Sequence, residues 1–197
     1  MIETKNTILR PVGINDIYDI YEYAKDEETG PRAGWPPHKN IETTRAIVEG
    51  WLSPDCDEEI LAIHHKGDNK VIGTVGIVCL SERFKDDRNT YVKELVESGK
   101  LTYEIGTTIL KQYWGRGVAT EALKATIDYI FDQKKADVII VCHYAENVGS
   151  KKVQEKNKLR EVFSYEREKP WFNTNCTTMI VREMTREEWI EQNTIQH

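Results

Sequence analysis

The segment 101–131 constrains the fold more than any other part of the chain. Its first part, LTYEIGTTIL (101–110), alternates as a strand does, and its last part, 118–131, places apolar residues at helical spacing. Between them lies QYWGRG, in which Gly115 and Gly117 stand just before the helix. Glycines at such a place let backbone N–H groups close around an anion, and the start of a helix adds unpaired N–H groups. The segment therefore predicts a strand–turn–helix unit with an anion site at the turn.

Patterns of the same kind predict a mixed α/β sheet with helices on its faces. We expect strands at 2–9 (stopped by Pro11), 58–65, 70–80, 101–110, 137–144, 160–168 and 177–185. We expect helices at 16–25, 41–52 (capped by Asn40), 118–131 and 146–159, with a short helical turn at 185–192. The Gly/Pro-rich stretch 30–40 is expected to be a loop, and the charged stretch 81–100 to hold one short helix around Tyr91.

The length and the net charge of the chain limit its domain organisation and the classes of partner that we expect. The 197 residues suffice for one well-buried unit, so we expect a single domain over 1–197. The formal net charge of −6 argues against a nucleic-acid partner held through its phosphates and is compatible with a cationic acceptor. The sequence shows neither a long apolar run nor the pattern of a secretion signal, so we expect a cytoplasmic protein without a membrane partner.

The cysteines form neither a metal-binding nor a disulfide pattern. Cys56, Cys79, Cys142 and Cys176 are scattered singly, with no CxxC and no histidine at ligand spacing. We therefore expect free thiols and no metal site.

Three kinds of anion site could use the two glycines. A Walker A loop is excluded, because it needs Lys and then Ser or Thr where the chain has Val-Ala. A dinucleotide-binding turn fits poorly, because Thr120 occupies its third glycine position and 111–114 separate the glycines from the strand. The third kind is Gln-x-x-Gly-x-Gly, present as Gln112, Gly115 and Gly117. An ordinary strand-to-helix turn remains the alternative to all three.

The turn and its surroundings resemble the GNAT superfamily of N-acetyltransferases, in particular its RimJ/RimL-type branch of ribosomal-protein N-terminal acetyltransferases and their relatives. Gln-x-x-Gly-x-Gly is similar to the acetyl-CoA signature of the superfamily, and YWGRGVATEAL resembles its form in this branch. Further likenesses cover nearly the whole chain: ILRP at 8–11, AGWPPHK at 33–39, ENVGSKKVQEK at 146–156 and TREEW at 185–189.

The resemblance implies a mixed, mostly antiparallel sheet, splayed open between its fourth and fifth strands (101–110 and 137–144), with pantetheine lying in the split. Two departures stand out. Lys158 and Leu159 follow the Asn-x-x-Ser helix, where the family commonly has Gly-Phe, and 81–100 is longer than the usual hairpin turn. We expect the first to alter packing under the thioester. The second could reshape a wall of the acceptor site or mediate a homodimer.

The resemblance also assigns residues to acetyl-CoA. Its pyrophosphate is expected at the turn and the first helical residues: Gln112, Trp114, Gly115, Arg116, Gly117, Val118, Ala119 and Thr120. Backbone N–H groups near Ile109 and Leu110 would polarise the thioester carbonyl and pair with pantetheine. Asn147 would bind near the pantetheine arm, and the Ser150 hydroxyl would protonate the departing thiolate. Both are also preferred N-cap residues, and the two roles can coexist.

Glu104 is the first candidate for the base that deprotonates the amine. Alternation along 101–110 places Glu104, Gly106 and Thr108 on one small, polar face, as a cleft wall would have, and the family often carries an acid on this strand. A solvated surface glutamate is the alternative. In the loop that resembles the family's substrate side, Trp35 and His38 are candidates for lining the acceptor site, although Trp35 could equally anchor the loop.

These residues lead to an acetyl-CoA-dependent N-acetyltransferase that acts by direct transfer, without a metal. Its acceptor would be a protein N-terminal amine or a small-molecule amine. Two alternatives stay open: a non-catalytic acyl-CoA-binding or regulatory module on the same fold, and a nucleotide-binding α/β protein that uses the glycines differently.

Overall fold

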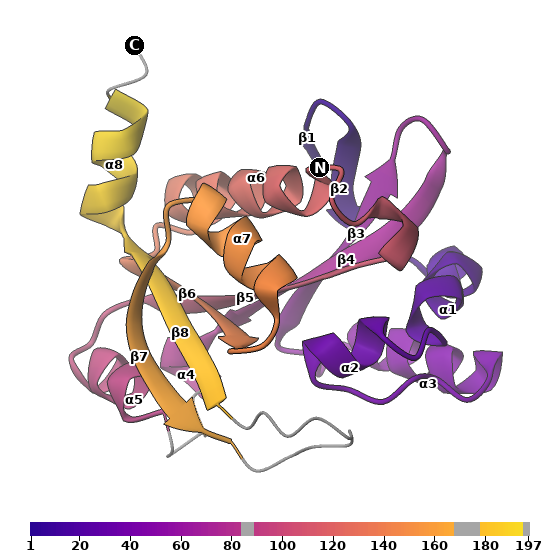
Figure 1. The fold of residues 1–197 in the computed structure, drawn as a ribbon, viewed down its shortest axis with the longest axis horizontal. Helices are drawn as coiled ribbons and strands as arrows, with labels where there is room; N and C mark the ends of the chain where they lie inside the picture. Colours follow the sequence, from indigo (N-terminus) through magenta and orange to yellow (C-terminus); the bar gives the residue numbers. More distant parts are fainter. Residues whose placement is uncertain (84–88, 168–177, 195–197) are drawn as a thin grey trace.

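The computed structural model describes residues 1–83, 89–167 and 178–194, which form one eight-stranded mixed sheet with helices on both faces (Figure 1). The described strands follow one another across the sheet as β1 (Ile2–Glu3), β2 (Thr7–Pro11), β3 (Glu58–His65), β4 (Lys70–Cys79), β5 (Thr102–Ile109), β6 (Val138–Tyr144), β8 (Thr178–Thr185) and β7 (Arg160–Glu166). Neighbouring strands are antiparallel except β5 and β6, which run parallel.

The helices lie on the two faces of this sheet. They are η1 (Ile14–Asp16), α1 (Ile17–Ala24), α2 (Thr29–Ala33), α3 (Ile41–Trp51), α4 (Leu80–Arg83), α5 (Thr90–Glu97), η2 (Lys111–Tyr113), α6 (Val118–Gln133), α7 (Val148–Lys156) and α8 (Arg186–Thr194). In Figure 1, α6 and α7 lie above the central strands, whereas α1–α3 and α5 lie below them.

The longest described helix, α6, lies where the spacing of apolar residues predicted a helix. In α6 the side chains of Ala122, Leu123, Ile127 and Ile130 are all buried in the main core, as their spacing requires. The predicted cap of α3 is also present, since Asn40 Oδ1 accepts a hydrogen bond from the N–H of Thr43 at 2.9 Å. Periodicity and capping together therefore located the main helices.

Two expectations about the first forty residues were wrong. The single strand 2–9 is two strands, because a turn held by Thr4 and Thr7 folds β1 back onto β2. The strand does stop at Pro11, which is the last residue of β2 and is paired with Leu61, a strand end where proline is tolerated. The stretch 30–40 is also not all loop, since it contains most of α2.

The described part of the charged stretch 81–100 packs onto the sheet. The predicted helix around Tyr91 is present as α5, and Val92 is buried in a second apolar cluster with Leu80 and Ile140. The Tyr91 hydroxyl donates to the buried carboxylate of Glu183 on β8. The stretch thus covers part of the sheet next to β5 and β6; residues 84–88 of it, and Cys176 elsewhere, lie outside the described residues.

The sheet opens between β5 and β6, as the resemblance implied. The two strands pair only over Thr102–Glu104 and Val138–Ile140. Beyond that point β5 remains paired with β4 as far as Ile109, and β6 with β8 as far as Tyr144. A V-shaped split therefore begins immediately after Glu104.

Lys158 replaces the family's usual glycine at a position that favours glycine. Its φ of 59° lies in the left-handed region, and its N–H donates to the carbonyl of Glu155 at 2.9 Å. The next N–H, of Leu159, donates to the carbonyl of Gln154 at 3.1 Å, which completes the bonding pattern of a glycine-type helix end. The Leu159 side chain is buried in the main core. The helix end therefore keeps its form without the glycine, at some backbone strain.

We expect Lys158→Gly to stabilise the protein by about 0.5–1 kcal/mol, because it relieves the strain of a left-handed lysine. Thermal unfolding should show a rise of about 1–4 °C for a chain of this length. Lys152→Gly, at an exposed position within α7, is the matched control and should lower stability by about 1 kcal/mol. Equal effects of the two substitutions would contradict this account of the helix end.

Candidate active site

Glu104 lies at the base of the split. It is opposite Val78 on β4 and Ile140 on β6, in the last pair that joins β5 to β6, and its side chain is half-buried. Two residues further towards the opening, Gly106 is exposed, and a Cβ placed there would meet no atom within 4 Å. The carboxylate therefore stands where the two walls separate, next to open space.

The two faces of β5 differ as predicted. Tyr103 faces the α6 side, because the Lys134 ammonium at the end of α6 lies 5.8 Å from its ring centroid. Thr108 faces the α1 side with its cross-strand partner Thr74, whose hydroxyl is hydrogen-bonded to that of Tyr23 on α1. Alternation places Glu104 on the same side as Thr108. The base of the split is thus open towards the face that carries α1 and α2.

Helix α2 contacts both walls of the split. On the β6 side, the Asn147 amide donates to the carbonyl oxygen of Arg32 at 3.2 Å. On the β5 side, the Arg32 guanidinium lies 5.2 Å from the Trp114 ring centroid, and Glu28 forms an ion pair with Lys111. The sequence pattern did not predict this helix, yet it bridges the segments that follow the two diverging strands.

The glycine turn forms the far end of the β5 wall. Gly115 and Gly117 have φ values of 74° and 82°, in the region that other residues rarely adopt, and a Cβ on either would meet no atom within 4 Å. The residues Val118, Ala119 and Thr120 open α6, so their N–H groups lack intrahelical acceptors. An anion at this turn would meet open space and the positive end of a long helix.

Glu121, the acidic residue in the first turn of α6, is hydrogen-bonded to the N-terminal hairpin. Glu121 accepts hydrogen bonds from the backbone N–H of Asn6, at 2.7 Å, and from the Asn6 amide, at 2.6 Å, and it also binds the Thr4 hydroxyl. These bonds lower the pKa of Glu121 against the opposing effect of its burial. Its negative charge is therefore committed to the N-terminal hairpin.

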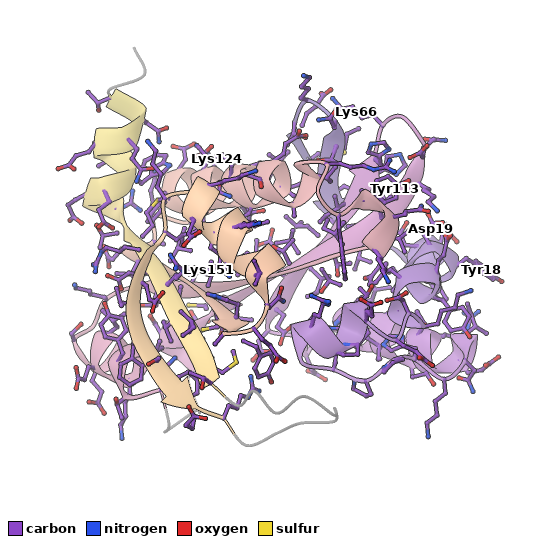
Figure 2. The ribbon with its side chains drawn as sticks, viewed as in Figure 1. Tyr18, Asp19, Lys66, Tyr113, Lys124 and Lys151 are labelled. Atoms are coloured by element: carbon purple, nitrogen blue, oxygen red, sulfur yellow. The ribbon has the colours of Figure 1, made fainter. Side chains whose placement is uncertain are left out.

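The remaining side chains of the turn are exposed. Gln112 and Arg116 are both accessible, and the Arg116 guanidinium lies 5.5 Å from the ring centroid of Tyr113, labelled in Figure 2. The Tyr113 hydroxyl donates to Asp68 in the β3–β4 turn. Burial, and then this carboxylate, raise the pKa of Tyr113. The buried Tyr113 ring thus supports the turn, while the Arg116 side chain that lies against it stays accessible.

The backbone groups of Ile109 and Leu110 point in opposite directions. The Leu110 N–H donates to the carbonyl of Ile72 on β4 at 2.7 Å. Because an antiparallel ladder alternates, the N–H and carbonyl of Ile109 point away from β4, towards the split. That carbonyl accepts a hydrogen bond from the Trp114 indole at 2.7 Å. Of the two expected N–H donors, only that of Ile109 therefore faces the split.

Asn147 and Ser150 stand at the start of α7, on the opposite wall. Asn147 Oδ1 accepts the Ser150 N–H at 3.1 Å, so the predicted N-cap is present. The Ser150 hydroxyl accepts a hydrogen bond from Nε2 of Gln154 at 2.9 Å. Both amide ends of Asn147 are bonded within the protein, whereas the hydroxyl hydrogen of Ser150 is not needed for its bond to Gln154.

The two acceptor-side candidates differ in their exposure. Trp35 is half-buried against the main core and covers Gly30, where a Cβ would lie 2.5 Å from its ring carbons. His38 is buried, with Nδ1 at 2.9 Å from the Thr44 hydroxyl, and burial lowers its pKa. Its ring also lies against Trp35, with 5.2 Å between centroids. His38 therefore supports the Trp35 loop from behind rather than presenting a free side chain.

Tyr144 is a further polar residue of the split that the sequence did not reveal. It ends β6, and its hydroxyl oxygen is buried without a hydrogen-bond partner among the described residues. A Cβ on Gly34, which follows α2, would lie 3.7 Å from that oxygen. The signal was only its position three residues before Asn147, which does not fix where a side chain points.

The described residues contain no group of three or more His, Cys, Asp and Glu side chains placed to hold a metal ion. Among these residues, no helix has both the length and the apolar character needed to cross a bilayer.

Comparison with known proteins agrees with this geometry. The model of the Acetyltransferase (GNAT) domain family matches residues 6–160. A relative from Bacillus subtilis (strain 168), named as the uncharacterized N-acetyltransferase YnaD, is 26% identical over 165 residues, covering 81% of this chain and 82% of its own length.

Solved structures show the same fold. A GNAT-family acetyltransferase from Bacillus anthracis has a TM-score of 0.74 at 22% identity, covering 95% of this chain and 99% of that one. The spermidine N-acetyltransferase from Vibrio cholerae, solved with CoA and spermine, has a TM-score of 0.73 at 14% identity, covering 94% and 98%. At these identities the likeness establishes the architecture, including the split sheet.

Proposed function

Because the chain belongs to the GNAT acetyltransferase family, we propose that it transfers the acetyl group of acetyl-CoA to an amine, without a covalent enzyme intermediate. The observation that carries this proposal is the V-shaped split between β5 and β6, with a carboxylate at its base and an open glycine turn on one wall. A split of this kind admits an extended thioester arm, and the turn ahead of α6 suits a pyrophosphate.

We assign the pyrophosphate to the turn and the first residues of α6. Gly115 and Gly117 leave room for close approach, the N–H groups of Val118, Ala119 and Thr120 are the donors, and Gln112 and Arg116 are accessible beside them. Trp114 fixes the end of β5 through Ile109. Asn147 borders the arm from the other wall, where it holds α7 to α2.

The reaction needs a neutral amine. Glu104 takes a proton from the ammonium group, directly or through a water in the open space beside Gly106. The amine nitrogen then forms a bond to the thioester carbon. The N–H of Ile109 faces the split and stabilises the negative charge that develops on the carbonyl oxygen.

The tetrahedral intermediate collapses when its C–S bond breaks. The electron pair leaves with sulfur, and the Ser150 hydroxyl donates a proton to the thiolate, so that CoA departs as the thiol. The hydroxyl regains its proton from solvent, and Glu104 loses the proton it had taken. The net products are an N-acetyl amine and CoA.

For the acceptor, we propose an amine that enters from the face of α1 and α2, past Trp35. The net charge of −6 favours a cationic acceptor. The resemblance to the RimJ/RimL-type branch favours a peptide N-terminus, and the spermine complex of the Vibrio cholerae neighbour makes a small polyamine the second class to test. We place the reaction in the cytoplasm and in a single domain over 1–197.

Calorimetric titration with acetyl-CoA tests this proposal, with ATP and NAD as competing ligands. We expect saturable binding of acetyl-CoA alone, and binding about 100-fold weaker in Gly117→Glu, which places a side chain and a negative charge on the pyrophosphate site. Gly99→Glu is the matched control. Gly99 has a φ of 80° and open space around it, but it lies at the other end of β5.

Both variants should therefore lose about 1–2 kcal/mol of stability from the left-handed backbone, and only Gly117→Glu should lose affinity. Binding of ATP or NAD without acetyl-CoA would overturn the proposal in favour of a nucleotide-binding protein. Release of CoA thiol in the presence of peptides or amines then establishes the transfer. Binding with no turnover on any acceptor would instead support a non-catalytic acyl-CoA module.

A further inference from the structure

A buried polar pair lies behind Ser150, and the proposed function has not used it. Gln154 is one helical turn after Ser150 and is 1% exposed, and His143 on β6 is 4% exposed. Gln154 uses its Nε2 for the bond to Ser150, and one further polar atom of each residue has no such bond. Gln154 Oε1 and His143 Nδ1 are both buried without a hydrogen-bond partner among the described residues. A buried unpaired polar atom is destabilising, so the presence of two in one pair calls for an explanation.

The orientation of the Gln154 amide decides what Ser150 can do. With Nε2 facing Ser150, at 2.9 Å, the amide donates and the hydroxyl accepts, so the hydroxyl hydrogen stays available for another acceptor. If the amide were reversed, Oε1 would take that hydrogen and Ser150 could no longer donate it. The direction of one buried amide therefore determines whether Ser150 can protonate a thiolate.

His143 supplies a reason for this orientation. Its burial, and then the positive charge of Arg182, lower its pKa, whereas the Gln154 side chain acts in the opposite direction. A neutral imidazole has one N–H donor, and the Gln154 side chain is close enough to His143 to act on its pKa. An N–H of His143 directed at the unpaired Oε1 would keep that oxygen away from Ser150 and leave Nε2 facing the hydroxyl.

We propose that Gln154, anchored by His143, is a positioning residue that holds the Ser150 hydroxyl as a proton donor to the departing thiolate. The inference rests on the proposed acetyl transfer and adds two residues that do not touch the substrate. It also gives a role to a buried polar side chain of α7 that packing alone would not require.

A double-mutant cycle tests the coupling. We expect Ser150→Ala to lower kcat about 100-fold and Gln154→Met about 10-fold, each with an unchanged KM for acetyl-CoA. In the Ser150→Ala background, Gln154→Met should change kcat less than about 2-fold, because a positioning residue has nothing left to position. Independent, multiplicative effects would overturn the proposal.

Gln154→Glu is the sharper variant, because it keeps the shape and replaces the donor by an acceptor. The carboxylate would take the Ser150 hydrogen, so kcat should fall about 10-fold or more. Gln154→Met, in contrast, removes the whole amide and keeps the volume of the side chain, so the melting temperature should change little. A purely structural role would lower stability and kcat together.

A readout without turnover completes the test. In NMR spectra of the free protein, the ring nitrogens of His143 should shift in Gln154→Met relative to the parent protein, and unchanged resonances would overturn the anchoring by His143. Full activity of Ser150→Ala would overturn this inference alone and leave the acetyl transfer standing. Absence of acetyl-CoA binding would overturn the proposed function, and this inference with it.

Discussion

Gly73→Ala is expected to lower the free energy of unfolding by about 3 kcal/mol, an effect at the upper end for overpacking in a core. A Cβ at position 73 of β4 would lie 2.1 Å from the carbonyl oxygen of Thr108 and 3.1 Å from the Cα of Ile109. Both are backbone atoms of β5, so no side-chain rotation can relieve the contact. The strands would have to separate next to the bond between the Leu110 N–H and the Ile72 carbonyl.

Thermal unfolding measures this loss, which should lower the melting temperature by about 6–12 °C for a chain of this size. Gly76→Ala is the matched control on the same strand, because its Cβ would make an ordinary contact at 3.5 Å with Ile60. That variant should be neutral or slightly stabilising, since alanine restricts the unfolded chain. If both substitutions gave the same melting temperature, the close approach of β4 and β5 would be refuted.

The strand–turn–helix unit at 101–131 could be predicted because its information is local. Alternation in β5, glycine in the turn and a 3.6-residue period in α6 each depend on near neighbours in the chain. Alternation also placed Glu104 and Tyr103 on opposite faces of β5, and the Tyr103 ring lies on the α6 side. Helix α2 was missed because Gly30 and Pro31 favour a turn. The contacts that favour the helix include packing of Trp35 over Gly30 and the Asp26 carboxylate, which accepts the Thr29 N–H at 2.8 Å.

The parts of the site that the sequence did not predict depend on contacts between segments far apart in the chain. Whether the N–H of Ile109 or Leu110 faces the split follows from the β4–β5 register, which no pattern within β5 encodes. His38 was a candidate for lining the acceptor site, but it is buried, with Nδ1 hydrogen-bonded to the Thr44 hydroxyl of α3. Tyr144 and Gln154 matter because each has a buried polar atom without a hydrogen-bond partner among the described residues, and burial is decided by tertiary packing.

Glu104→Gln is expected to lower kcat/KM by about 100-fold or more, which is the range for loss of a general base. Glutamine keeps the size of the side chain but cannot accept the proton of an ammonium group. Affinity for acetyl-CoA should be unchanged, because the pyrophosphate turn is at the other end of β5 from this residue. The measurement is steady-state release of CoA thiol with whichever amine the acceptor panel identifies, together with calorimetry for acetyl-CoA.

The pH dependence separates a base from a structural carboxylate. As the pH rises towards the pKa of the acceptor amine, more of that amine arrives neutral, so the deficit of Glu104→Gln should shrink. A carboxylate that only held the fold would give the same deficit at every pH. The control is Glu59→Gln on β3, whose carboxylate lies on the α6 side, with the Tyr129 hydroxyl at 3.0 Å and the Lys134 ammonium at 2.7 Å. It should keep full activity, because these partners lie on the opposite face of the sheet from the base of the split.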